Sequence, residues 1–222
     1  MKKIFFILSL LFVVHVFAQD AGRVKLTFPQ GEWVTISTKD APLVYGGVLP
    51  GTLPAQATVR ALLDENKNLL AVLFIRAGEY GISRGKMNWN AGCKNENTEY
   101  IVDATEGSYT RLDCLRVWRE MTPETWLQKN TKQAYADLEK LGVKYGPKAF
   151  QIVHAVGTDN GTFVYTNMII PYGTLKKIPD AAKGAKFDGK PGVAFGHLFA
   201  DAIRTSTRTM SGELTVPPID YR

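Results

Sequence analysis

The chain has little of the chemistry that enzymes gather in their active sites. Only three histidines and two cysteines occur in its 222 residues. The common catalytic and nucleotide-binding patterns are missing: there is no Gly-x-Ser-x-Gly turn, no phosphate-binding loop and no His-Glu-x-x-His helix. Two cysteines and a distant histidine are also too few for a zinc site. We therefore expect no cofactor and no metal, and no ready-made catalytic residues.

Long hydrophobic runs are missing as well, except at the start of the chain. Lys2 and Lys3 precede an apolar run over 4–14, and small Ala18 closes the segment. This three-part pattern is typical of a secretory signal, and the run is shorter than the roughly 20 residues of a membrane span. We expect cleavage after Ala18. The sequence thus predicts a signal peptide over 1–18 and a protein over 19–222 that is periplasmic or secreted and does not span a membrane.

Positive charge is in modest surplus. The formal net charge is +6, and loss of Lys2 and Lys3 with the signal lowers it to +4. The densest basic stretch holds Lys176, Lys177, Lys183, Lys186 and Lys190, and we interpret it as a solvated loop. Because nucleic-acid binding needs a concentrated basic surface, we expect no nucleic-acid partner.

The two cysteines, Cys93 and Cys114, are predicted to form a disulfide, since an even count in an exported protein is typical of one. A redox-active pair normally lies two residues apart at the start of a helix, which this spacing does not match. Closing the loop between them would stabilise the fold by about 3 kcal/mol in the chain-entropy account.

Turn signals and alternating apolar residues predict a sheet made of hairpins. Strands are expected over 55–63 and 69–76, over 100–105 and 109–118, and over 149–156 and 162–170 around Asn160-Gly161. An earlier pair is expected over 23–28 and 33–38, with 39–54 as a loop. Helical spacing predicts helices over 122–142 and 191–210. The fold class is therefore α+β: one domain over 19–222, an antiparallel sheet with two main helices packed on it.

The opening strand supports a family-level comparison. Val24-Lys25-Leu26-Thr27-Phe28-Pro29, followed by Gly31-Glu32-Trp33, resembles the start of PsbP-like domains. The resemblance implies an antiparallel sheet between helices. It also implies action by binding rather than by catalysis.

His154 and Asn167 form the first candidate site. A two-residue turn at Asn160-Gly161 would place residues whose numbers sum to 321 opposite each other, so His154 would face Asn167 on one side of the sheet. One interpretation is a partly buried imidazole bonded to the amide. The other is a polar pair at the base of a ligand cleft. His197 lies on one helix face with Asp201, Arg204 and Arg208, which is typical of a solvated face.

Trp89 is the second candidate. It stands between Asn88 and Asn90 and close to Cys93, and such a group could hold a sugar or a peptide by stacking and hydrogen bonding. The alternative is that Trp89 covers the disulfide in a small satellite core.

Two functions remain open on the sequence. The first is an exported, non-catalytic binding or envelope-associated protein, whose partner is a small ligand or an envelope component. The second is a small periplasmic hydrolase with His154 as the base. A hydrolase needs His154 in a cleft, near an acidic residue and a hydroxyl, whereas an imidazole buried against the sheet would remove this alternative.

Overall fold

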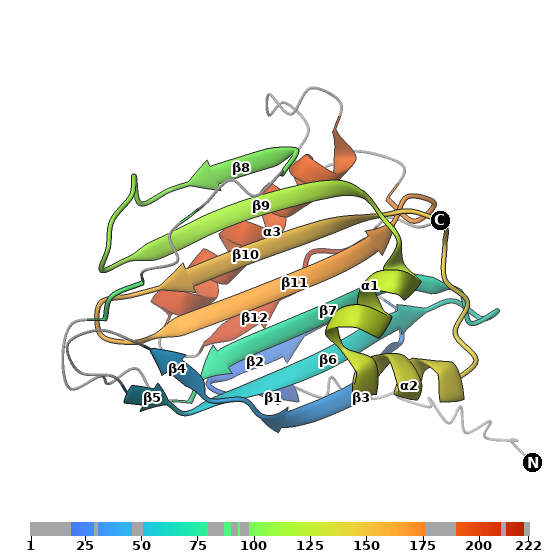
Figure 1. Ribbon diagram of the computed structural model, residues 1–222, viewed down its shortest axis with the longest axis horizontal. Helices are drawn as coiled ribbons and strands as arrows, with labels where there is room; N and C mark the ends of the chain where they lie inside the picture. Colours follow the sequence, from blue (N-terminus) through green and yellow to red (C-terminus); the bar gives the residue numbers. More distant parts are fainter. Residues whose placement is uncertain are drawn as a thin grey trace, which may run out of the picture.

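The centre of the molecule is a seven-stranded antiparallel sheet (Figure 1). The computed structural model describes residues 19–28, 31–45, 51–79, 87–89, 93, 98–175, 190–209 and 212–219. The strand order is β3-β6-β7-β11-β10-β9-β8. The bounds are β3 (Trp33–Asp40), β6 (Ala55–Leu63), β7 (Leu69–Gly78), β8 (Tyr100–Asp103), β9 (Leu112–Met121), β10 (Ala149–Gly157) and β11 (Phe163–Pro171). The predicted α+β fold and its three later hairpins are confirmed.

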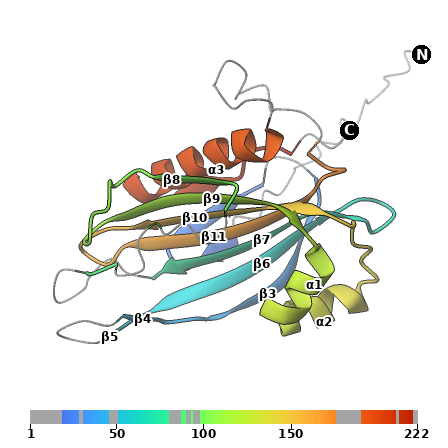
Figure 2. The ribbon, with the colours of Figure 1, turned by 45° about the horizontal axis from the view of Figure 1, so that its top comes forward.

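One face of this sheet, which we call the covered face, carries α3 (Pro191–Arg208) and a second, three-stranded sheet (Figure 2). Most alternate strand residues on the covered face are apolar and buried, as the period of two requires, and a few buried polar residues, among them Arg60 and His154, lie between them. Small residues let α3 approach closely, since a Cβ added at Gly192 would lie 2.4 Å from the Phe150 ring. Phe195, Phe199 and Ile203 of α3 complete this core.

The second sheet contradicts one prediction. It contains β1 (Gln19–Ala21), β2 (Val24–Thr27) and β12 (Glu213–Thr215), with β2 antiparallel to β1 and parallel to β12. The predicted hairpin of 23–28 with 33–38 is therefore wrong, because β3 pairs with β6 instead. Alternation marks a segment as a strand but does not select its partner. Here burial of Val24 and Leu26 in the main core decides where β2 lies.

The opposite face of the main sheet carries α1 (Pro123–Asn130) and α2 (Lys132–Lys140) at one end (Figure 2). Leu127, Ala134 and Leu138 pack there against the sheet. The single helix predicted over 122–142 is wrong, because the chain leaves helical geometry at Thr131, where φ is −146°. Two side chains form hydrogen bonds to backbone carbonyls of α1 at this break: Asn130 Nδ2 donates to Trp126 O at 2.9 Å and Thr131 Oγ1 donates to Leu127 O at 3.2 Å.

The segment predicted as a loop over 39–54 contains a short hairpin. β4 (Leu43–Tyr45) pairs with β5 (Gly51–Leu53) as a separate two-stranded sheet. Leu43 and Leu53 contribute to a small apolar cluster with Ala55, Met87, Trp89 and Phe163. We call this group the end cluster, because β4 and β5 lie at the end of the sheet away from α1 and α2 (Figure 1).

The register of β10 and β11 differs from the predicted one. His154 lies opposite Thr166, and Asn167 lies opposite Val153. The turn contains five residues rather than two, because the Thr158 and Thr162 backbones bond at 2.9 Å around the Asn160 side chain, whose Oδ1 accepts from Thr162 N at 3.1 Å. A shift of one residue moves a side chain to the other face of a sheet. The predicted pairing of His154 with Asn167 is therefore wrong.

The predicted disulfide between Cys93 and Cys114 is present, with an S–S distance of 2.05 Å. It ties Cys93, outside the strands, to β9. None of the helices in the described part of the chain is both long and apolar enough to cross a bilayer. The predicted signal over 1–18 lies outside the described residues. The same holds for all of the basic stretch except Lys190.

Candidate functional site: a cleft on the open sheet face

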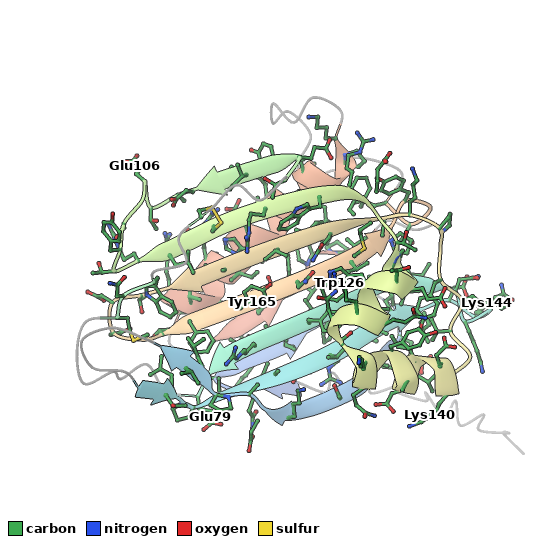
Figure 3. All side chains as sticks on the ribbon, in the orientation of Figure 1. Glu79, Glu106, Trp126, Lys140, Lys144 and Tyr165 are labelled. Atoms are coloured by element: carbon green, nitrogen blue, oxygen red, sulfur yellow. A yellow bond between two sulfur atoms is a disulfide. The ribbon has the colours of Figure 1, made fainter. Side chains whose placement is uncertain are left out.

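None of the described helices covers the part of the sheet face between α1–α2 and the end cluster (Figures 1 and 2). We call it the open face. Figure 3 shows Tyr165 on this face and Trp126 beside it on α1. Both side chains retain exposed surface, and that of Tyr165 amounts to 37%. A sheet face lined by aromatic and polar side chains at the surface is a candidate ligand site.

Strand register places two rows of side chains on the open face. Partners across the strands share a face because side chains alternate. The first row runs Lys39, Ala57, Arg76 and Tyr165, and the second runs Ser37, Val59, Phe74 and Asn167. Both rows cross β3, β6, β7 and β11.

These rows form the floor of a cleft of about 460 Å³, which we call the sheet cleft. Its roof is the junction of the two short helices, where Trp126, Asn130, Thr131, Lys132 and Gln133 line it. The volume lies within the ordinary range of small-molecule sites. The break at Thr131 is thus part of the site, since residues from the end of α1 and the start of α2 line the cleft.

Arg76 is the best-anchored cation of the sheet cleft. Its Nε donates to Ala41 O at 2.6 Å, a second guanidinium nitrogen donates to Pro42 O, and the guanidinium lies 6.0 Å from the Phe163 ring centroid. Burial lowers the pKa of Arg76 from its ordinary value. The arginine therefore holds the 41–42 backbone against the sheet and brings positive charge to the floor.

The charge of the sheet cleft is of one sign. Lys39, Arg76 and Lys132 line it, and none of the described residues of its lining is Asp or Glu. Lys39 and Lys132 are exposed. Arg116 of β9 lies further along the same face, where its guanidinium is 5.3 Å from the Trp118 ring centroid. The open face is therefore more positively charged than the small net charge of the whole chain would give on average.

The neutral groups of the sheet cleft combine rings with amides. Trp126 meets Phe74 edge to face, with ring centroids 5.5 Å apart. Asn167 is only 5% exposed, and its Oδ1 accepts a hydrogen bond from Gln151 Nε2 at 3.3 Å. Asn167 thus lies in the cleft that the structure forms, although without His154.

The other predicted ligand residue, Trp89, packs in the end cluster. Its ring lies over Gly157, where an added Cβ would be 2.5 Å from the indole, and its Nε1 donates to Thr158 O at 3.1 Å. The ring centroids of Trp89 and Phe163 are 6.1 Å apart. Trp89 therefore bounds the open face and belongs to a satellite core.

His154 lies on the covered face in a buried polar network. Its side chain has no exposed surface, and Nε2 lies 2.9 Å from Asp113 Oδ1. Arg204 of α3 binds the same carboxylate, with Nε to Oδ2 at 2.7 Å and Nη2 to Oδ1 at 2.9 Å. Burial would raise the pKa of Asp113, but the bonds from His154 and Arg204 outweigh it and lower the pKa to about 2.

Burial keeps His154 neutral. Desolvation lowers the pKa of the imidazole more than the Asp113 carboxylate raises it. A neutral imidazole that donates from Nε2 leaves Nδ1 as an acceptor, and Nδ1 is buried without a hydrogen-bond partner in the described part of the chain. Thr166, opposite His154 on β11, uses its Oγ1 to donate to the His154 carbonyl at 3.1 Å. Within this described network, no side chain is presented to solvent as a base.

The solvated helix face predicted for α3 is only partly correct. Asp201 and Arg208 are exposed, but Arg204 is half-buried in its bonds to Asp113. His197 is also half-buried, with Nε2 at 2.8 Å from the Tyr100 hydroxyl. The i,i+4 pattern on the helix could not reveal partners that come from β8 and β9.

A larger cleft, of about 570 Å³, lies beyond the turn between β6 and β7. Three groups of its lining already bond within the protein: Asn68 donates to Asp64, Lys148 pairs with Glu120, and the Tyr172 hydroxyl accepts from Glu120 N. We favour the sheet cleft as the candidate site, because cations from three elements line it and its described lining contains no carboxylate.

Sequence reasoning misses most of the sheet cleft, including Arg76, Tyr165 and Trp126. Arg76 within the apolar run over 69–76 is the available signal, because a cation in a buried strand needs a structural or functional reason.

In the part of the chain that the structure describes, no group of three or more His, Cys, Asp or Glu is placed to hold a metal ion. Comparison of the chain with protein-family models, curated proteins and solved structures finds no match. The resemblance to PsbP-like domains therefore stays a prediction.

Proposed function

We propose that the protein is exported and acts without catalysis, binding a small ligand or an envelope component in the sheet cleft. The observation that carries the proposal is the cleft itself, on a sheet face that none of the described helices covers. The floor and roof of the cleft present rings, amides and cations. Such a combination of apolar surface and a few polar groups is typical of ligand sites.

Two features support export. Residues 1–18 have the pattern of a secretory signal. The disulfide between Cys93 and Cys114 is of the kind that persists in oxidising compartments.

The buried position of His154 favours binding over hydrolysis as the function. Its imidazole has no exposed surface, and the carboxylate that it bonds, Asp113, also holds Arg204. A general base must reach the proton that it removes, directly or through one water. A hydrolase based on His154 would therefore need α3 to move away from the sheet before substrate could enter.

Export is tested by expressing the full chain in a bacterial host and isolating the envelope fraction. We expect the mature protein to begin at Gln19 and to show no free thiol on alkylation without reductant. A protein that retains Met1 and stays in the cytoplasm would contradict export.

Ligand binding is tested by native mass spectrometry of the protein purified from envelope extract. We expect bound small molecules on the native protein that are lost in Ala57→Trp, because Ala57 lies on the cleft floor between Lys39 and Arg76. Ala136→Trp, on the exposed side of α2, is the control and should keep them. Equal retention by both variants would move the site away from the sheet cleft.

A further inference from the structure

We infer that the ligand of the sheet cleft is a short acidic oligosaccharide, whose carboxylates are bound by Lys39, Arg76 and Lys132. The inference rests on the proposed function, since it specifies the chemistry of what the same cleft binds. It depends on charge, on the kinds of neutral side chain and on the shape of the floor.

The positive charge of the sheet cleft favours an anionic ligand. The three cations line the cleft from three different elements, β3, β7 and α2, so they converge on one space rather than form a run on one helix. The described lining holds no carboxylate to neutralise them. Like charges that line one cavity raise its local positive potential and attract an anion. A neutral ligand would gain nothing from this potential, and a cationic ligand would be repelled by it.

The neutral side chains select a ligand that is rich in hydroxyl groups. Asn130 and Gln133 on the roof each use their amide nitrogen within the protein, to Trp126 O and to Asp137 Oδ2. Their amide oxygens, with the Asn167 amide nitrogen and the Ser37 hydroxyl on the floor, can accept from or donate to ligand hydroxyls. Trp126 and Tyr165 supply ring surface beside them. A sugar ring presents hydroxyls at its edge and C–H groups on its faces, so it satisfies both kinds of side chain at once. A fatty acid would satisfy only the apolar surface and one cation.

The shape of the floor favours several linked rings over one. The floor runs from Lys39 on β3 through β6 and β7 to Tyr165 on β11. Crossing from the first of these strands to the last covers three strand spacings, a length of about 14 Å. The cations occur along this line on β3 and β7, with Lys132 above on the roof. Spaced positive charges match a chain that carries one carboxylate on each sugar unit.

The test uses the mature protein and two trisaccharides of equal length, trigalacturonate and uncharged maltotriose, with isothermal titration calorimetry and tryptophan fluorescence as readouts. We expect trigalacturonate to bind and maltotriose to bind at least tenfold more weakly. Raising the NaCl concentration about tenfold should weaken trigalacturonate binding, since screening acts on exposed charge pairs.

Variants then locate the bound anion. Lys39→Gln and Lys132→Gln should each weaken trigalacturonate binding about tenfold, the effect of losing one charge-assisted hydrogen bond. Both lysines are exposed, so the variants should fold. Lys25→Gln makes the same change on an exposed position of β2, in the second sheet on the covered side, and should leave the affinity unchanged.

The inference on ligand class is overturned if trigalacturonate does not bind, if maltotriose binds equally well, or if both lysine variants bind like the native protein. The proposed function is decided separately. Envelope material that Ala57→Trp loses but that carries no acidic sugar would keep the binding function and reject the acidic oligosaccharide. Material that Ala57→Trp retains would reject both.

Discussion

On the covered face of the main sheet, Asp113 lies among His154 and Arg204 and has a pKa of about 2. On the open face, Lys39 and Lys132 stand at a cleft whose described lining has no carboxylate. On the covered face, Asp113 and Arg204 therefore neutralise each other, although Arg60 of β6 is also buried there with Nε and Nη1 unpartnered in the described part of the chain. On the open face, the exposed lysines are left to solvent. Buried charges need partners to avoid a desolvation cost, whereas exposed charges do not. This difference indicates a structural role for the covered face and favours a binding role for the open face.

The largest expected effect comes from breaking the covered-face network. Asp113→Asn removes the carboxylate that binds both His154 and Arg204. The change should lower the free energy of unfolding by about 3 kcal/mol, because it leaves Arg204, whose side chain is 19% exposed, with only the exposed Asp201 as a counter-ion. Urea denaturation of the mature protein measures the change.

Asp201→Asn is the matched control. Asp201 also binds Arg204, at 2.8 Å, but its side chain is 70% exposed. Its loss should therefore cost less than about 1 kcal/mol, the usual limit for an exposed ion pair. If the two variants lost equal stability, burial would not distinguish the two faces as we describe.

The next effect concerns the disulfide that ties Cys93 to β9. The two cysteines are separated by 21 residues along the chain. Reduction should lower the free energy of unfolding by about 3 kcal/mol, since the closed loop no longer restricts the unfolded chain. Thermal melts with and without reductant measure it, and reductant should not affect the Cys93→Ser, Cys114→Ser double variant. Full alkylation of both cysteines in the untreated folded protein would refute the pairing.

Acid should destabilise the fold first through the titratable groups of the covered face. The pKa of Asp113 falls from 3.8 in the unfolded chain to about 2 in the fold. The unfolded chain therefore binds more protons as the pH drops below about 4, and about 2 kcal/mol of stability, present above that pH, is lost progressively as the pH falls toward about 2. His154 acts in the same direction, because burial keeps it neutral below the usual pKa of 6.5, where the unfolded imidazole is protonated.

This contribution is measured by comparing the native protein with Asp113→Asn. The free energy of unfolding of each is determined at neutral pH and at about pH 3. The variant should lose less stability over that interval. Identical pH profiles for both proteins would show that other carboxylates control the acid response.

The smallest effect on stability is expected on the open face. Tyr165→Ser removes a ring that is 37% exposed. It should change the free energy of unfolding by less than about 1 kcal/mol, since surface substitutions away from the core cost little. The same variant should weaken ligand binding in the sheet cleft. Chemical denaturation and the binding assay, run on one preparation, separate the two results, and a large loss of stability would make Tyr165 a core residue.

Much of the fold can be predicted from the chain. Alternation and apolar runs in β6, β7, β10 and β11 mark the central hairpins, and Pro191 marks the start of α3, because these signals are local. The partner of β2 and the break at Thr131 are not predicted in this way. The partner of β2 depends on contacts between residues far apart in the sequence, and the helical spacing over 122–142 continues across Thr131, so it does not indicate a break there.

The candidate site is harder to predict. The sequence points to Asn167 through its expected position opposite His154, but the five-residue turn places the two on opposite faces. It points to Trp89 through its amide neighbours, but Trp89 closes a satellite core. Arg76 and Trp126 escape sequence reasoning, because a cation in an apolar strand and a tryptophan at a helix start usually have a structural role.

The sequence by itself determined the hairpins β6–β7, β8–β9 and β10–β11 and the pairing of the two cysteines, since turn residues, alternation and a single possible partner can be seen in the chain. Only the tertiary structure decided the partner of β2, the β4–β5 hairpin and which side chains share a face. A shift of one residue in register moves the side chains of a strand to the other face, and residues on both sides of the helix break at Thr131 line the sheet cleft. The contrast between the Asp113–Arg204 pair and the exposed Lys39 and Lys132 depends on these faces, because contacts between distant elements assign each residue to one of them.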